Sequence, residues 1–223
     1  MGCLLISGSG RKHLEAGTFS TWLETTRSAL KHDQETDVPC GACNACCRSA
    51  YFIHIKPDEI DTLAHIPSEL LFPAPGQPKG NVLMGFDENG HCPMLKDGAC
   101  SIYEHRPLTC RSYDCRIFPA TGIHVDGKDK SAIVDQVKRW KFSLPEERDN
   151  QHLKSVQRSA TFLRTRSKLF PEGELPANST QLAIMAIKVH ELFMETDLAS
   201  TNDDEMVEAV INSRDSFDNK EPS

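Results

Sequence analysis

Eight cysteines fall into two short stretches of this 223-residue chain, and they constrain its fold more than any other feature. The first stretch has the spacing Cys-x-x-Cys-x-x-Cys-Cys, and the second spreads four cysteines over residues 92–115. The eight positions are Cys40, Cys43, Cys46, Cys47, Cys92, Cys100, Cys110 and Cys115. Thiols this close together are held either by oxidation to disulfides or by a metal. The choice between these two states decides what kind of domain the chain can form.

The sequence favours metal over disulfides. The apolar run Leu4–Ile6 is cut short by the polar residues 8–12, so it does not make a secretory signal. Ile6 stands where a myristoylation pattern requires Ser or Thr, and we expect a disordered N-terminus without lipid. A cytoplasmic protein is therefore expected, and structural disulfides are rare in that compartment. Two-residue gaps between cysteines also give good chelates.

Composition narrows the classes of partner. The net charge of −7 argues against a nucleic-acid binder, which would normally present a basic face. The sequence lacks an apolar stretch of about 18 residues, so no integral membrane segment is expected. With 39% hydrophobic residues, the chain can bury one core and carry helical appendages.

The pattern predicts an α+β fold in which a small, irregular, metal-centred domain with short strands packs against C-terminal amphipathic helices. Four segments are expected: an N-terminal extension with a helix (1–37), a cysteine-cluster metal-binding domain (38–126), a helical layer (127–213) and a disordered tail (214–223).

Local signals place elements within these segments. A helix is expected over residues 18–31, strands over 51–55 and 82–86, a helix over 57–66, and a loop over the proline-rich residues 72–80. Residues 92–119 should form turns and short helical pieces that metal bonds hold in place. Further helices are expected from about residue 145, over 182–193 with Ser179 or Thr180 as the cap, and as a short helix at 207–211.

The cysteine spacing itself indicates metal chemistry. Two cysteines separated by two residues can place both sulfurs within reach of one ion, at Zn–S distances of about 2.3 Å. Consecutive residues such as Cys46 and Cys47 point in different directions, which favours two adjacent centres or a polynuclear cluster. Eight thiolates make two Cys₄ sets, which suit two zinc ions or an iron–sulfur cluster such as [4Fe–4S]. The nearby arginines are expected to offset the thiolate charge: Arg48, Arg106, Arg111 and Arg116.

The ordered motif resembles a known family. Cys40-x-x-Cys43-x-x-Cys46-Cys47 is followed by Cys92-Pro93-x-Leu95 and by Gly98-x-Cys100-x-Ile102-Tyr103-Glu104-x-Arg106-Pro107-x-x-Cys110-Arg111-x-Tyr113-x-Cys115. This string is similar to the YkgJ-type cysteine-cluster family, whose members are described as zinc- or iron-chelating proteins. A similar module in flagellin lysine methylases is thought to hold an iron–sulfur centre. The resemblance implies that the eight cysteines act together, and it transfers no methylase activity.

These observations support a cytoplasmic protein that chelates zinc or an iron–sulfur cluster through a multi-cysteine centre. Two alternatives stay open: a redox or metal-dependent enzyme that uses an iron–sulfur cluster, and a metal-stabilised adaptor whose helical part binds a protein partner. Catalytic residues cannot be assigned, and no cofactor beyond the metal is indicated. Four histidines near the motif are candidate replacement ligands, with His91 the strongest of them: His54, His91, His105 and His124.

Overall fold

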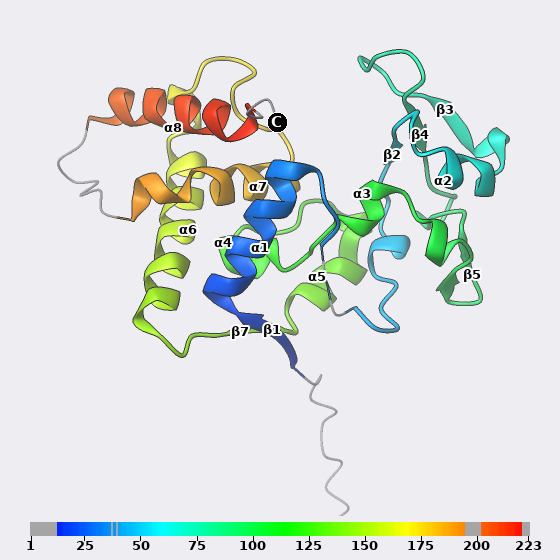
Figure 1. The fold of residues 1–223 in the computed structure, drawn as a ribbon, viewed down its shortest axis with the longest axis horizontal. Helices are drawn as coiled ribbons and strands as arrows, with labels where there is room; N and C mark the ends of the chain where they lie inside the picture. The colour runs from blue at the N-terminus through cyan, green and yellow to red at the C-terminus, as the bar shows by residue number, and fades with distance from the viewer. Residues whose placement is uncertain (1–12, 37, 39, 195–201, 220–223) are drawn as a thin grey trace, which may run out of the picture.

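The computed structural model describes residues 13–36, 38, 40–194 and 202–219, so the predicted disordered N-terminus and Cys3 lie outside the described residues. Figure 1 shows two parts side by side, a larger helical part and a smaller part built from short strands and turns. Short strands combined with helices make the architecture α+β, as predicted. None of the helices in the described ranges is both long and apolar enough to cross a bilayer.

The helices and strands are short in the cysteine-rich segment and longer on either side of it. The helices are α1 (Phe19–His32), α2 (Ile60–His65), α3 (Leu108–Arg111), α4 (Ile117–Thr121), α5 (Ser131–Val137), α6 (Glu147–Thr165), α7 (Ser179–Val189) and α8 (Asp203–Asp218). The strands are β1 (Leu14–Thr18), β2 (Ile53–Ile55), β3 (Leu71–Pro73), β4 (Val82–Met84), β5 (Leu95–Lys96), β6 (Ala99–Cys100) and β7 (Trp140–Ser143). Single 3₁₀ turns include η1 (Cys46–Arg48) and η3 (Tyr103–His105).

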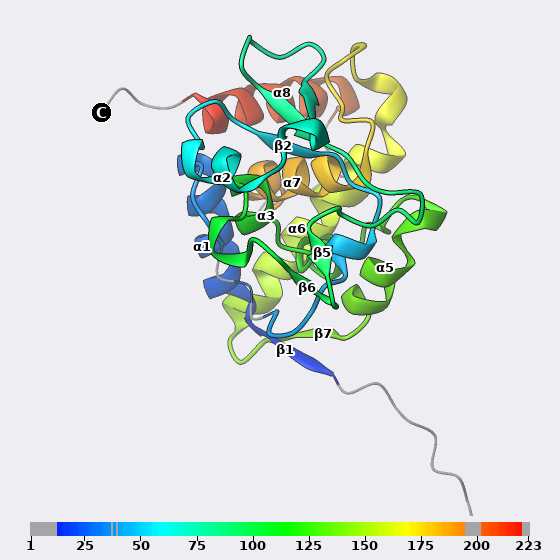
Figure 2. The same cartoon turned by 90° about the vertical axis from the view of Figure 1, so that its right-hand side faces the viewer.

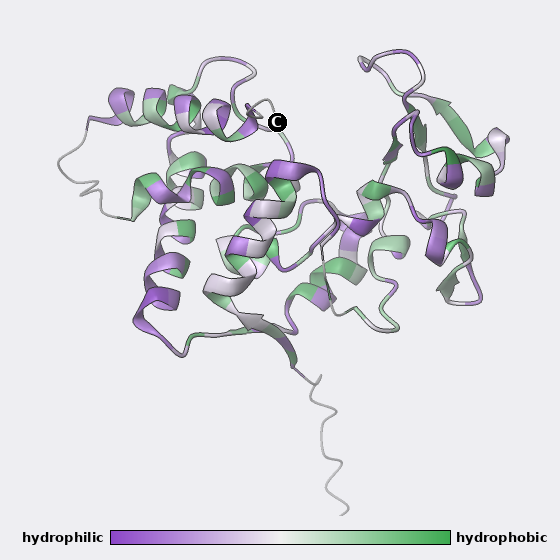
Figure 3. Ribbon diagram, viewed as in Figure 1, coloured by the Kyte–Doolittle hydropathy of each residue, from purple (hydrophilic) through white to green (hydrophobic). Residues whose placement is uncertain are grey.

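The main hydrophobic core lies between α1, α4, α6, α7 and α8. Figure 3 shows green and purple residues interleaved along these helices, as expected for helices with one buried face. Fully buried side chains such as Phe19, Phe118, Leu163 and Ile187 come from three of the four segments predicted from the sequence. Cys115 belongs to the same core, so the cysteine-rich segment and the helical layer share buried surface.

Helix ends differ from the predictions in two places. The N-cap of α7 is Asn178, whose side-chain oxygen accepts from the Gln181 amide at 2.9 Å, and not Ser179 or Thr180 as predicted. The predicted short third helix is longer, because α8 runs from Asp203 to Asp218. Residues 214–218 are therefore helical where a disordered tail was predicted. Arg214 anchors this end through a hydrogen bond to the carbonyl of Glu174.

A parallel pair of strands joins the N-terminal segment to the middle of the chain. β1 precedes α1 and pairs with β7, with a bulge between Glu15 and Gly17. Phe142 of β7 packs edge-on against Phe19, with ring centroids 5.0 Å apart. No sequence pattern predicted this pair, since its strands are short and far apart in the chain. It ties α1 to the segment before α6 (Figure 1).

The smaller part holds a three-stranded antiparallel sheet in the order β2-β4-β3 and the β5–β6 hairpin (Figure 2). The predicted strands and the helix at 57–66 are present, with shorter bounds. Phe72 and Pro73 lie in the edge strand β3 and not in a loop as predicted, because an edge strand tolerates a proline. A second, smaller core packs here against Cys92 and Cys100, and it consists of Ile55, Ile66, Met84, Met94 and Ile102.

Candidate metal centre

All eight motif cysteines are free thiols in the structure. Cys40 and Cys43 lie on a tight turn that leads into η1, and Cys46 and Cys47 belong to η1 itself. The amide of Cys43 donates to the carbonyl of Cys40 at 2.9 Å, and Gly41 provides the positive φ (54°) that this turn requires. The others come from four separate places: the turn before β5 (Cys92), the end of β6 (Cys100), α3 (Cys110) and the segment just before α4 (Cys115), which is buried in the main core.

Two hydrogen bonds bring the first cysteine stretch against the second. The Cys92 amide donates to the carbonyl of Cys47 at 2.8 Å. The side-chain amide of Asn44 donates to the carbonyl of Gly98 at 2.8 Å, next to the β5–β6 hairpin that carries Cys100. These contacts join residues far apart in the sequence, as the prediction of a shared centre requires.

One group of sulfurs consists of Cys40, Cys43 and Cys115. Burial raises the pKa of Cys40 to about 11, and repulsion from Cys43 and Cys46 contributes to the same shift. Burial likewise raises the pKa of Cys115 to about 12, with Cys40 and Cys43 among the charges that act on it. Mutual repulsion of this kind requires sulfurs that lie near one another. A cation among them would reverse it.

The other group consists of Cys47, Cys92, Cys100 and Cys110. Burial is the main cause that raises the pKa of Cys110, and repulsion from Cys92 and Cys100 adds to it. Burial also raises the pKa of Cys92, again with repulsion from Cys100. Cys47 interacts with both Cys92 and Cys100. This group therefore combines one sulfur of the first stretch with three of the second.

Cys46 interacts with members of both groups. Its charge acts on Cys40 in the first group, and on Cys92 and Cys110 in the second. A hydrogen bond from the Cys47 thiol lowers the pKa of Cys46 to about 7 and raises that of Cys47. Thiolates are the form that binds metal, so this hydrogen bond favours the metal-binding form of Cys46.

The donor set fits a soft or borderline metal ion. Around a zinc ion with bonds of about 2.3 Å, thiolate sulfurs lie roughly 3.8 Å apart. Among the described residues, the sulfurs form no set of three within 4.8 Å of one another, so the thiols are more widely spaced than bound metal would hold them. Most of them lie on turns or at element ends, where small backbone movements can close this gap. Sulfur ligands exclude calcium and magnesium as natural occupants.

Two of the four predicted arginines lie where they can offset thiolate charge. Arg106 acts on Cys46 and Cys110, and its guanidinium stacks 3.6 Å from the Tyr103 ring centroid. Arg116 acts on Cys40 and is buried. Arg111 instead bonds to the Arg106 carbonyl and to Glu35, and Arg48 is exposed.

Two side chains that the sequence did not single out support the centre from the main core. The indole N–H of Trp140 donates to the Cys115 sulfur at 3.2 Å. Asp114 pairs with Arg116 at 2.8 Å and accepts from the Trp22 indole at 2.8 Å. Asp114 is next to Cys115 in the sequence and could have been noticed for that reason, but nothing near Trp140 in the sequence indicates a role at the centre. Only the tertiary fold places its ring on the sulfur.

The candidate histidines have partners other than sulfur where the structure shows their bonds. His54 bonds to Asn81 at 2.8 Å, and His105 bonds to Asp61 at 2.6 Å. The backbone amide of His91 donates to Asp87 at 2.8 Å, which closes the turn before Cys92. His124 is exposed. For His54 and His105, these bonds argue against replacement of a thiol as ligand.

A pocket of about 580 Å³ opens beside the centre, between the smaller part and the helical part. Four of the motif cysteines line it: Cys46, Cys47, Cys92 and Cys110. Tyr51, Tyr113 and Lys130 also line it. The hydroxyls of the two tyrosines lie 3.3 Å apart, and Lys130 lies 4.6 Å from the Tyr51 ring centroid. Burial raises the pKa of both tyrosines. They therefore remain protonated at neutral pH.

Free, converging thiols on an irregular scaffold define a metal-binding thiolate domain. Residues 39–139 of the chain match a protein-family model named CxxCxxCC, described as a putative zinc- or iron-chelating domain. The matched segment and its description agree with the family resemblance that the cysteine pattern indicated. No curated protein and no solved structure gives a significant match to the chain.

The family match covers more than the cysteines. It extends to residue 139 and thus includes α4 and α5, which follow the last motif cysteine. α1, α6, α7 and α8 lie outside it and complete the main core. The zinc- or iron-chelating description agrees with the metal predicted from the thiol spacing.

Proposed function

We propose that this chain is a cytoplasmic metal-binding protein that holds zinc or an iron–sulfur cluster in two adjacent four-thiolate sets. One set is Cys40, Cys43, Cys46 and Cys115, and the other is Cys47, Cys92, Cys100 and Cys110. The observation that carries the proposal is the pattern of interactions among the thiols, which groups Cys40 and Cys43 with Cys115, and Cys47 with the other three cysteines of the second stretch. Cys46 interacts with both groups, and we assign it to the first because that completes a set of four.

Two zinc ions, or one iron–sulfur cluster in a single set, are both compatible with this arrangement. Zinc would act as a structural cross-link, since four thiolates leave no open position on a tetrahedral ion. An iron–sulfur cluster would add a reversible one-electron change, tuned by hydrogen bonds such as that from Trp140 to Cys115. Anaerobic purification with elemental analysis and a visible spectrum distinguishes the two. Zinc found in aerobically purified protein does not distinguish the two, because zinc occupies thiolate sites from which an iron–sulfur cluster has been lost.

The assignment of ligands to sets is tested with one variant from each. If each set holds a zinc ion, Cys43→Ser and Cys110→Ser should each lower the metal content by about half and reduce the folded fraction. If one set holds an iron–sulfur cluster, only the variant in that set should lose the iron. A variant in one set should leave the spectrum of the other set in place. Cys3→Ser is the matched control, because Cys3 stands outside the motif. Full metal stoichiometry in both motif variants would overturn the proposal.

A second candidate function is a redox or metal-dependent enzyme, and the pocket beside the centre favours it. A volume of about 580 Å³ is enough for a small organic ligand, and such a ligand would meet both the sulfurs and the tyrosine pair. The test uses cobalt-substituted protein with azide and cyanide as probes. A change in the cobalt d–d bands would reveal a position open to exogenous ligands, and unchanged bands would argue for a closed, structural centre.

The adaptor hypothesis calls for an apolar patch on the C-terminal helices. Within the described residues, none of the large hydrophobic side chains with high exposure belongs to α7 or α8. Three of them lie near the β2-β4-β3 sheet instead, where the ring of Phe52 contacts those of Phe72 and Phe86. A partner bound through α7 or α8 is therefore not supported.

A further inference from the structure

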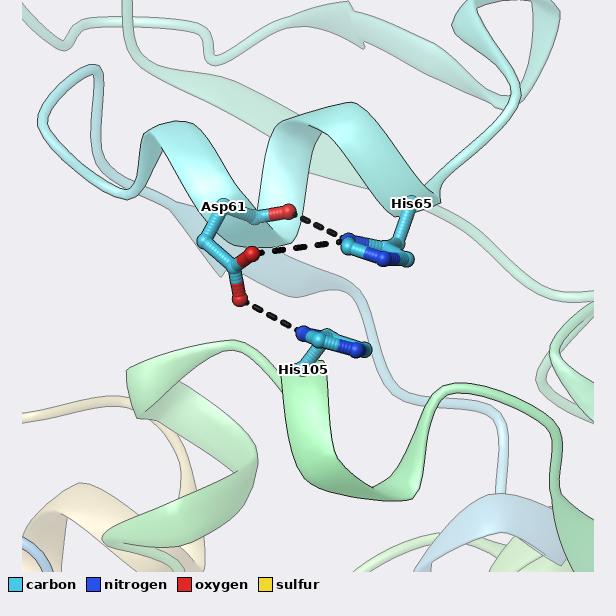
Figure 4. Close-up of side chains that lie close together, drawn as sticks. All are labelled: Asp61, His65 and His105. Carbon is cyan, nitrogen blue, oxygen red and sulfur yellow. Dashed lines mark hydrogen bonds and ion pairs between the residues drawn. The ribbon is translucent and has the colours of Figure 1, made fainter.

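A second group of metal-ligating side chains lies outside the thiolate centre, on the surface of the smaller part. Asp61 and His65 are one turn apart on α2, and His105 ends the neighbouring turn η3 (Figure 4). One ligand atom of each residue lies within 4.8 Å of the others. Within the described residues, this is the one group of three or more Asp, Glu, His or Cys side chains that meets this distance.

The carboxylate of Asp61 organises the group. His105 Nδ1 lies 2.6 Å from Asp61 Oδ2, and His65 Nδ1 lies 3.7 Å from Asp61 Oδ1. The two imidazole rings stack with centroids 3.5 Å apart and planes only 6° apart. Figure 4 shows both Nδ1 atoms on the side of the stack that faces Asp61. Two ring nitrogens and one carboxylate oxygen thus face a common point.

The chemistry of these ligands differs from that of the cysteines. Two imidazoles and a carboxylate suit borderline divalent ions such as zinc, nickel and cobalt. The hydrogen bond from His105 lowers the pKa of Asp61, so this group is a carboxylate at neutral pH. In a tetrahedral site with bonds of about 2.0–2.1 Å, such ligand atoms lie roughly 3.3 Å apart. The His65–Asp61 distance of 3.7 Å is slightly longer than this and the His105–Asp61 distance of 2.6 Å is shorter, so small side-chain movements and a tilt of the stacked rings would suffice.

We propose that Asp61, His65 and His105 form a second, surface site for a divalent transition-metal ion. All three side chains are at least 38% exposed, so the ring rotations that the site needs meet little steric resistance. The ion replaces the proton between His105 and Asp61 and the hydrogen bond from His65 Nδ1 to the Asp61 carbonyl. Water fills the remaining coordination position.

The position of the site gives it a structural consequence. The residues after η3 lead directly to α3, which carries Cys110. α2 already holds this segment, because Glu59 at its start accepts from the Leu108 amide at 2.6 Å. An ion shared by α2 and η3 would brace the same segment from outside. The site does not depend on the ligand assignment within the thiolate centre.

The test is a nickel titration of the full-length protein with its thiolate centre loaded as purified. Isothermal titration should show one additional Ni²⁺ equivalent in the wild type. Intense sulfur-to-nickel absorption bands must stay absent, since they would report exchange at the cysteines. His65→Ala, His105→Ala and Asp61→Asn should each weaken this binding at least tenfold. The zinc or iron content should not change.

His124→Ala is the matched control, because His124 is an exposed histidine elsewhere on the chain. It should leave the additional equivalent and its affinity unchanged. Absence of the extra equivalent in the wild type would overturn the proposal, and so would unaltered affinity in the three site variants. Circular dichroism spectra of these variants should match the wild type, because the substituted side chains lie on the surface. Loss of thiolate metal without loss of nickel binding would instead count against the proposed function alone.

Discussion

The amide of Cys92 donates to the carbonyl of Cys47 at 2.8 Å, and this bond joins the two cysteine stretches through the backbone. It places Cys92 next to the pair Cys46–Cys47 whether or not the sulfurs bind metal. The two stretches therefore approach each other partly through main-chain contacts. Metal would complete an arrangement that the backbone has begun.

Removal of the metal should loosen the smaller part far more than the helical part. The smaller core consists of a few side chains, such as Met84 and Met94, packed against Cys92 and Cys100. The main core has many more fully buried side chains from α1, α6 and α7. Hydrogen exchange after chelation should show faster exchange in β2 and β4 and little change in α6 and α7. Uniform loss of protection in both parts would contradict this expectation.

Replacement of Trp140 by Phe should weaken one metal equivalent and spare the other. The substitution removes the indole donor to Cys115 at 3.2 Å and keeps an aromatic ring. Since hydrogen bonds to charged groups contribute about 1.5–3 kcal/mol, the affinity should fall by at least tenfold. Competition with a coloured chelator measures the two equivalents separately. Equal weakening of both would show that the effect spreads through the fold.

Asp114→Asn should destabilise the protein by about 3 kcal/mol or more, because it removes the buried carboxylate charge that pairs with Arg116 at 2.8 Å. Urea unfolding measures this difference. Glu24→Gln is the matched control, since it breaks an exposed ion pair with Arg148 that should contribute about 0–1 kcal/mol. Similar losses in the two variants would argue against a special role for the buried pair.

Stability should fall as the pH drops from about 6.5 to 4, partly through His190. Burial and the nearby Arg27 lower the pKa of His190 to about 4, while Glu191 opposes the shift and His152 adds to it. Between these values the unfolded chain binds a proton that the folded chain does not. Folding stability is therefore lost as pH decreases, by at most about 1.4 kcal/mol per pH unit from this group.

The contribution of His190 is isolated by comparison with His190→Gln, which does not titrate. The urea-unfolding free energy of this variant should change less between pH 6.5 and 4 than that of the wild type. Effects of acid on the thiolate centre are common to both proteins, so the difference between the two curves reports His190 together with its interaction with His152. Parallel curves would mean that His190 does not carry this dependence.

The sequence predicts local elements well where the signal is local. The helix of residues 19–32 follows from its apolar spacing, and the strand of residues 53–55 follows from its residue types. The β1–β7 pair escaped prediction, because neither strand is long enough to show a pattern and pairing depends on the whole intervening fold. The cap of α7 was missed by one residue, since adjacent Asn178, Ser179 and Thr180 are all good capping types.

The cysteine motif indicates the candidate centre, but not how the sulfurs are grouped. Cys40 and Cys43 share a turn, and this proximity follows from their spacing alone. Their interaction with Cys115 does not follow from spacing, because the chain from Cys43 to Cys115 passes through the entire smaller part. The Asp61–His65 pair follows from helical spacing, whereas the stacking of His105 on His65 depends on how η3 lies against α2.

The proposed ligands belong to both hydrophobic cores. Cys115 is buried in the main core, whereas Cys92 and Cys100 pack against the smaller one. Bound metal would therefore cross-link the smaller part and the helical part, and the pocket described above opens between the same two parts. A loss of the ions would remove this cross-link, and a change in their charge would change its strength. The position of the smaller part relative to the helical part would therefore depend on whether the centre is occupied.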